Sequence, residues 1–163
     1  MKMLKIAVPL LLVMMFALAV TACAQQPTVS TTTGSGSTPT ATTSSSSNAL
    51  IHTATATVKG TSETILTNAQ GLTLYYRTTD KPPSKVCSGA CAGAWPPILF
   101  TGSGSPTSST QLSGKLTAVT DANGNQVEYN GHPLYTFASD SGPGQTNGEG
   151  VGGIWFVVTP GLK

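Results

Sequence analysis

One sequence pattern occurs twice in the chain, and its second occurrence lies sixty residues after the first. Gly71-Leu72-Thr73-Leu74-Tyr75 returns as Gly131-His132-Pro133-Leu134-Tyr135. Repetition at a fixed period predicts one domain built from two copies of a single supersecondary unit. The same spacing carries an aspartate and the chain's two tryptophans, which are matched as Asp80 with Asp140 and Trp95 with Trp155.

The first 22 residues are predicted to be a lipoprotein signal peptide. Two lysines precede an apolar run from Ile6 to Val20, which is shorter than the roughly 20 residues of a membrane span. The run ends at Val20-Thr21-Ala22-Cys23, a pattern at which the cysteine is lipidated and becomes the new N-terminus. We expect acyl chains such as palmitate on Cys23, which would anchor the protein to the outer face of the cytoplasmic membrane, or to an outer membrane where one exists. The alternatives are an ordinary secretory signal and an uncleaved anchor.

Residues 23–48 are predicted to form a disordered tether. The stretch from Pro27 to Ser47 is almost entirely Ser, Thr, Pro and Gly, and it cannot bury enough apolar surface to fold. The folded part is then residues 49–163, a single domain with repeats at about 60–110 and 120–160. Without the signal peptide, six basic and six acidic side chains remain. This balance argues against a nucleic-acid partner.

Short runs of threonine, branched and aromatic residues predict an all-β fold, in which two β-hairpin-based repeats form one small antiparallel sheet assembly. Asn130-Gly131 predicts a two-residue hairpin turn, and Asn68–Gly71 a four-residue one. Only Cys87–Ala94 is expected to form a short helical turn, which Pro96 would stop. The expected strands are residues 54–58, 63–67, 72–76, 116–119, 126–129, 133–137 and 153–158.

Cys87 and Cys91 are the cysteines of the folded part. Because an exported domain lies in an oxidising compartment, we expect them to form a structural disulfide. Two alternatives stay open, a redox-active pair and a copper site with His132 as a further ligand. The second copy has Asn147 and Val151 at the matching positions. We predict no metal and no cofactor.

Asp80 and Asp140 each follow a predicted strand, and their repetition favours a role in capping a turn. A carboxylate pair for acid–base chemistry is the alternative, and Asp140 with Asn147 and Glu149 forms a possible calcium site. No nucleophile-elbow or phosphate-loop motif is present, and we predict no enzymatic activity. Most aromatic residues of the repeats are expected in the core, with a ligand-stacking face as the alternative: Tyr75, Tyr76, Tyr135, Trp95 and Trp155.

The repeat resembles a family of predicted bacterial secreted-repeat lipoproteins that carry a Tyr-x-[Phe/Trp/Tyr]-x-x-Asp motif. The resemblance covers about residues 60–160, and it rests on this motif in both copies and on the segment from Cys87 to Pro97. Phe137 keeps the aromatic position of the motif in the second copy, whereas Arg77 replaces it in the first.

The resemblance implies a lipoprotein of unknown function. We expect a non-catalytic binding or structural module of the cell envelope, attached to the membrane through Cys23, with a cell-wall or extracellular component as a possible ligand. The alternative is a redox or copper-handling lipoprotein that uses Cys87 and Cys91.

Overall fold

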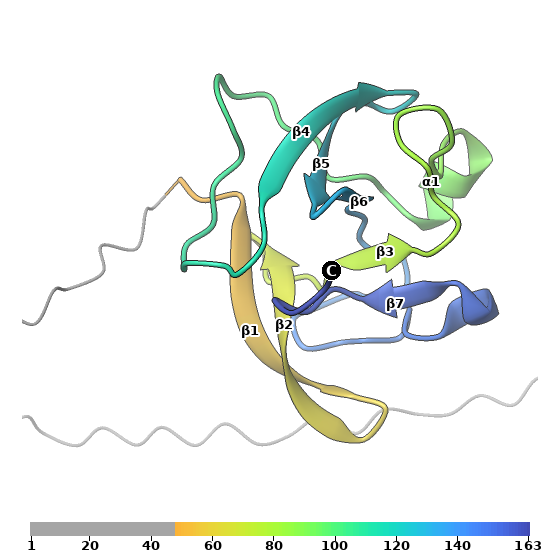
Figure 1. Cartoon of the computed structure of the whole chain (residues 1–163). Coiled ribbons are helices and arrows are strands. Elements are labelled where there is room, and N and C mark those ends of the chain that lie inside the picture. The colour runs from red at the N-terminus through yellow and green to blue at the C-terminus, as the bar shows by residue number, and fades with distance from the viewer. Residues whose placement is uncertain (1–47) are drawn as a thin grey trace, which may run out of the picture. The chain divides into compact units, whose positions relative to one another are not determined.

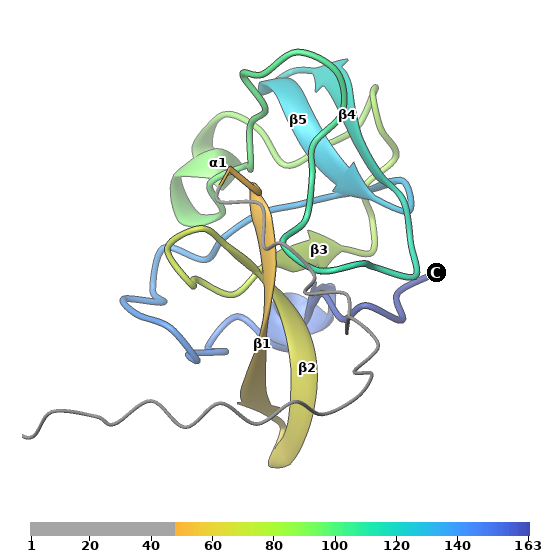
Figure 2. The same cartoon turned by 90° about the vertical axis from the view of Figure 1, so that its left-hand side faces the viewer.

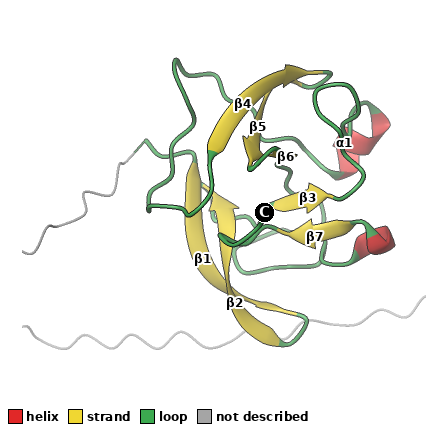
Figure 3. Ribbon diagram, viewed as in Figure 1, coloured by secondary structure: helices red, strands yellow, loops and turns green. Residues whose placement is uncertain are grey.

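Three small antiparallel sheets form the framework of the domain (Figures 1 and 3), in a computed structural model that describes residues 48–163. The predicted signal peptide, Cys23 and the tether up to residue 47 lie outside the described residues. The strands are β1 (Ile51–Val58) with β2 (Thr61–Asn68), β3 (Tyr75–Arg77) with β7 (Trp155–Val157), and β4 (Leu116–Asp121) with β5 (Gly124–Tyr129) and β6 (His132–Pro133). The helical elements are α1 (Ala90–Ala94) and a 3-10 turn, η1 (Val151–Gly153). The all-β prediction and the short helical turn are confirmed.

The turns form where the sequence supplies residues suited to them. Asn130 and Gly131 join β5 to β6 with φ angles of 50° and 80°, which the left-handed positions of a two-residue hairpin turn require. In the turn after β2, the side-chain oxygen of Asn68 accepts the backbone N–H groups of Gln70 and Leu72, at 3.0 and 2.9 Å. Both predicted turns are therefore present, although the runs on either side of the second are joined only by an isolated antiparallel bridge between Thr67 and Thr73.

Two strands are shorter than the sequence predicts. The run 72–76 begins its ladder only at Tyr75, and the run 133–137 contributes only its first residue to β6. For the second run the reason lies beyond Leu134, whose N–H still donates to the Val127 carbonyl of β5 at 2.9 Å, because the chain then pairs with the other copy. There Tyr135 donates its N–H to the Tyr75 carbonyl at 3.0 Å, and Tyr75 donates to the Tyr135 carbonyl at 2.8 Å.

The two copies exchange their closing segments, which we define as residues 94–98 and 154–158. Val158 of the second copy donates to the Leu74 carbonyl of the first at 2.8 Å. Ile98 of the first copy donates to the Leu134 carbonyl of the second at 2.9 Å. These bonds join equivalent positions in the opposite sense, so a pseudo-twofold axis relates the copies. Each closing segment thus pairs with the tyrosine strand of the other copy.

The domain has two apolar clusters, one on each face of the central crossing. Adjacent residues of an extended chain point to opposite faces. Tyr75 and Tyr135 accordingly lie in one cluster with both tryptophans, and their neighbours Leu74 and Leu134 lie in the other. Figures 1 and 2 show the β1–β2 hairpin on one side, β4 and β5 on the opposite side, and β3 between them.

Candidate functional site

The tyrosine and aspartate of the repeat motif are paired across the two copies. The Tyr75 hydroxyl donates to Asp140 Oδ2 at 2.6 Å, and the Tyr135 hydroxyl donates to Asp80 Oδ2 at 2.7 Å. Both tyrosine side chains are completely buried. The motif therefore makes its main polar contact with the other copy and not within its own.

Each aspartate sits in a tight turn directly after the tyrosine strand. The Asp80 N–H donates to the Arg77 carbonyl at 3.2 Å, and the Asp140 N–H donates to the Phe137 carbonyl at 3.0 Å. The sequence predicts these turns, but it does not predict the hydrogen bonds that the carboxylates make with the other copy. Each carboxylate accepts a tyrosine hydroxyl, and within residues 48–163 no hydrogen bond joins the two aspartates to each other.

Backbone N–H groups complete the shell around both hydroxyls. Cys87 donates to the Tyr135 oxygen at 3.1 Å, and Gly148 donates to the Tyr75 oxygen at 3.3 Å. Position 148 requires glycine, because a Cβ there would lie 2.8 Å from the Tyr75 ring. The glycine-rich segment of the second copy is thus packed against the core.

Burial raises the pKa of Tyr75 far above its usual range, and the hydrogen bond to the Asp140 carboxylate adds to the effect. The pKa of Tyr135 is raised in the same way, by burial and then by its hydrogen bond to Asp80. A carboxylate that accepts a hydroxyl opposes the loss of that proton. Both tyrosines are therefore neutral donors at physiological pH.

The tryptophans form the centre of a four-layer stack. Trp95 and Trp155 lie face to face, with ring centroids 3.8 Å apart and planes inclined by 5°. Phe137 covers the outer face of Trp95 at 4.3 Å. At the other end, the Arg77 guanidinium carbon lies 5.6 Å from the Trp155 centroid, a cation–π contact. Arg77 thus occupies the place in the first copy that Phe137 occupies in the second.

The remaining oxygen of each aspartate is held differently in the two copies. Asp80 Oδ1 accepts from Arg77 Nε and pairs with Arg77 Nη2, both at 2.5 Å. Asp140 Oδ1 accepts from the backbone N–H and the side-chain amide of Asn147, at 3.1 and 3.0 Å. The second carboxylate oxygen therefore has hydrogen-bond donors in both copies, from the Arg77 guanidinium in the first and from Asn147 in the second.

Cys87 and Cys91 form a disulfide with a Cα–Cα distance of 5.4 Å, which confirms the predicted bridge. Cys87 is 1 % exposed, whereas Cys91 is half-buried at the start of α1. Arg77 Nη1 lies 3.8 Å from Cys91 Sγ. The disulfide therefore has one inaccessible sulfur and one beside a guanidinium.

The residues named for metal sites meet only in pairs, because Asp140 is hydrogen-bonded to Asn147 and Cys87 is bonded to Cys91. His132 Nε2 is 3.1 Å from the Lys163 carbonyl, and its ring packs on Tyr76. Glu149 pairs with Lys59 at 2.9 Å and also accepts the Val157 N–H at 2.8 Å. Within residues 48–163, no group of three or more His, Cys, Asp and Glu side chains is arranged to hold a metal ion.

A family described as a secreted repeat of unknown function matches the chain twice, over residues 56–98 and 117–159. The chain belongs to this family. The two matches fall on the two copies that the structure intertwines, and this secreted-repeat protein is an extracytoplasmic module. No curated protein and no solved structure matches the chain.

The secreted-repeat domain also buries a carboxyl group that no sequence signal singles out. Glu128 on β5 is 5 % exposed, and its Oε1 has no hydrogen-bond partner. Burial raises the pKa of Glu128, the negative charge of Asp121 adds to this, and His132 opposes it. In the sequence it alternates with apolar neighbours, as an exposed strand residue also does.

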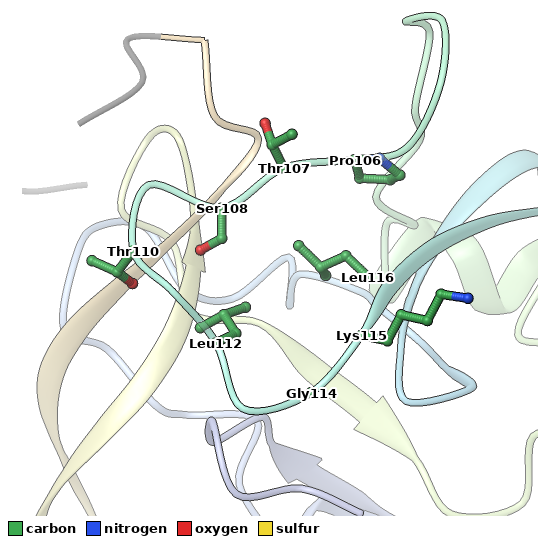
Figure 4. A pocket seen from close by; sticks show the side chains of 8 residues that line it. All are labelled: Pro106, Thr107, Ser108, Thr110, Leu112, Gly114, Lys115 and Leu116. Atoms are coloured by element: carbon green, nitrogen blue, oxygen red, sulfur yellow. The ribbon is translucent and has the colours of Figure 1, made fainter. Parts of the chain in front are cut away.

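A pocket of about 420 Å³ lies beside the point where the described part of the secreted-repeat chain begins. The N–H groups of Leu50 and Ile51 both donate to the Thr107 carbonyl on its rim, at 3.1 and 3.2 Å. Ser108 Oγ is buried without a hydrogen-bond partner there. Sequence reasoning missed this pocket, because its loop reads as a polar linker between the copies. The lining residues are shown in Figure 4: Pro106, Thr107, Ser108, Thr110, Leu112, Gly114, Lys115 and Leu116.

Proposed function

We propose that the protein is a lipid-anchored envelope module whose repeat motif has a structural role and whose surface binds an envelope component. The observation that carries this proposal is the closed Tyr–Asp network. Tyr75 and Tyr135 give their hydroxyls to Asp140 and Asp80. The opposite oxygen of each carboxylate is held by Asn147 or Arg77. Groups committed to one another in this way stabilise a fixed scaffold.

Attachment through Cys23 is supported by the Val20-Thr21-Ala22-Cys23 pattern and by membership in a secreted family. No helix within residues 48–163 is long and apolar enough to cross a membrane. We expect full-length protein from cell membranes to enter the detergent phase on Triton X-114 partition, and the Cys23→Ser variant to leave it. Unchanged partition of Cys23→Ser would contradict lipid anchoring.

The pocket of Figure 4 is the surface that we propose for binding. It combines leucine side chains with an unpartnered serine hydroxyl at Ser108, and such a mixture suits a ligand with both apolar and hydroxyl-rich parts. The ligand class that fits is a cell-wall glycan or its peptide.

Binding is tested by co-sedimentation of the full chain carrying Cys23→Ser with purified cell-wall material. Thr110→Trp would fill the pocket from an exposed position, and Thr101→Trp is the matched change at an exposed threonine outside it. We expect Thr110→Trp to abolish co-sedimentation and Thr101→Trp to leave it unchanged. Equal behaviour of the two variants would contradict binding at this pocket.

A further inference from the structure

The two copies depart from their shared pattern at one place in the fold. Arg77 replaces the aromatic residue of the motif, and Cys87 and Cys91 stand where the second copy has Asn147 and Val151. Cys91 follows Arg77 by 14 residues in the sequence. In the structure they meet, because Arg77 Nη1 lies 3.8 Å from Cys91 Sγ and the two sulfurs are bonded. The second copy serves as an internal control for what the first copy has added.

The replacements are also linked chemically. Asn147 holds Asp140 Oδ1 in the second copy, whereas Arg77 holds the matching Asp80 Oδ1 in the first. Because Arg77 takes over the carboxylate, position 87 no longer needs an amide and is free to carry a sulfur. The guanidinium uses Nε and Nη2 on Asp80, which leaves Nη1 directed to Cys91.

Access distinguishes the two sulfurs. Cys87 is 1 % exposed and Cys91 is half-buried, so a thiolate arriving from solvent meets Cys91 Sγ first. A positive charge beside this sulfur attracts the incoming anion, and it stabilises the Cys91 thiolate when Cys91 leaves the mixed disulfide in a second exchange. The nearby Asp80 carboxylate is already paired with Arg77 and with the Tyr135 hydroxyl.

We propose that Cys91 is a thiol-exchange site, at which external thiols reversibly modify the protein. An external thiolate forms a new S–S bond to Cys91 Sγ as the Cys87–Cys91 bond breaks, and Cys87 leaves as a thiolate that takes a proton from solvent. One external thiol is consumed and the Cys87 thiol is formed, so the number of disulfide bonds is unchanged. A second external thiolate then attacks the sulfur that the first external thiol contributed to the mixed disulfide. This releases a disulfide of the two external thiols, and Cys91 leaves as a thiolate, so both cysteines are then reduced.

This modification is stoichiometric and does not rest on the proposed binding role. The fold survives opening of the bridge, because the second copy keeps the matching architecture with Asn147 and Val151 in place of the cysteines. The substrate class is a low-molecular-weight thiol or an exposed cysteine of another extracytoplasmic protein.

The site of attack is tested on the full chain carrying Cys23→Ser, in which Cys87 and Cys91 are the remaining cysteines. The protein is incubated with reduced glutathione, quenched with N-ethylmaleimide and mapped by peptide mass spectrometry. We expect glutathione on Cys91 and the alkyl group on Cys87. Glutathione mainly on Cys87, or no mixed disulfide at all, would overturn the proposal.

The role of Arg77 as a positioning residue is tested in two variants of that chain, both with Cys91 as the remaining thiol. One carries Cys87→Asn, and the other carries Cys87→Asn with Arg77→Phe, which reproduces the combination used by the second copy and is therefore expected to fold. We expect iodoacetamide to alkylate Cys91 roughly five- to tenfold faster at neutral pH when Arg77 is present. The rate–pH profile should also move to higher pH when Arg77 is removed.

A matched loss of positive charge controls for the general electrostatic field. Lys163→Gln removes an exposed lysine outside the proposed binding pocket, and it should leave the alkylation profile of the Cys87→Asn chain unchanged. Identical profiles with and without Arg77 would overturn its role.

Discussion

Trp95 and Trp155 stack face to face at 3.8 Å across the pseudo-twofold axis of the domain. The stack joins one residue from each copy, and both side chains are buried, at 5 % and 4 % exposure. Tyr75 packs edge-on against Trp95 and Tyr135 against Trp155. The contact between the copies therefore has the same composition from either side.

Cutting either tryptophan to alanine should destabilise the whole domain. We expect Trp95→Ala and Trp155→Ala each to lower the free energy of unfolding by roughly 3–5 kcal/mol. The double variant should lose less than the sum, because the two rings share one contact. Urea unfolding followed by far-UV circular dichroism measures this, with the exposed Leu99→Ala as control. Independent, additive effects would contradict the shared stack.

Removing a tyrosine hydroxyl should leave a buried carboxylate oxygen without its partner. Tyr75→Phe removes the hydrogen bond to Asp140 Oδ2, and Tyr135→Phe removes the hydrogen bond to Asp80 Oδ2. We expect about 1.5–3 kcal/mol of destabilisation for each, the range for hydrogen bonds to charged groups. Tyr76→Phe, a change at a partly buried neighbour, should cost much less. Equal losses at all three positions would count against the cross-copy pairs.

The same tyrosines set the alkaline limit of stability. Their pKa is raised in the folded state by burial and by the aspartates, so the folded protein retains protons that the unfolded chain releases above about pH 10. The contribution of these tyrosines to stability should therefore be constant below that pH and fall as the pH rises through it. Thermal unfolding from neutral pH to about pH 11 tests this. The double variant Tyr75→Phe/Tyr135→Phe should show a shallower decline.

Glu128 should make stability depend on pH in the acidic to neutral range, whereas the tyrosines do so in the alkaline range. Its pKa is raised by burial and by Asp121, so the folded state prefers the neutral acid and loses stability as the pH rises through the usual carboxyl range. Glu128→Gln mimics the neutral form. We expect this variant to gain stability over the parent at pH 7 and to gain less near pH 4, with Glu63→Gln on β2 as control. A gain that is independent of pH would argue against a titrating Glu128.

The exchange of closing segments predicts that one copy alone cannot fold. A fragment that ends near residue 103 loses the strand that pairs with Tyr75, and the complementary fragment loses the partner of Tyr135. We expect fragments 48–103 and 104–163 to be unfolded separately and to form a one-to-one folded complex on mixing. Circular dichroism and sedimentation check this. A cooperative unfolding transition in either isolated fragment would contradict the exchange.

The sequence predicted the local parts of the fold well. Asn130-Gly131 marks a turn that local geometry requires, and Cys87 and Cys91 are close enough in sequence for a short bridge. The fixed spacing of Tyr75 and Tyr135 predicts two related copies. Each of these inferences depends on neighbours within a few residues or on the repeat itself.

The partner of each tyrosine could not be predicted, because the repeat makes the two possible solutions look alike. Asp80 and Asp140 are the same residue type at equivalent positions, so Tyr75 finds an identical chemical partner whether the copies close on themselves or exchange. The hydrogen bond that forms joins Tyr75 to Asp140, which are 65 residues apart in the sequence. Arg77 departs from the motif, but the sequence does not show that its guanidinium bonds Asp80 three residues on and also reaches Cys91, because both contacts depend on how the side chain is directed in the fold.

The exchanged closing segments also bear on how such a chain came to exist. A single ancestral repeat would have lacked the strand that covers its own tyrosine, and two separate copies could have supplied it to each other as a symmetric homodimer. Duplication within one gene would then have joined the halves through the loop that now runs from residue 101 to 115. Fusion removes the requirement that both halves mutate together. In a fused chain the two halves can carry different residues at equivalent positions, as Arg77, Cys87 and Cys91 do against Phe137, Asn147 and Val151.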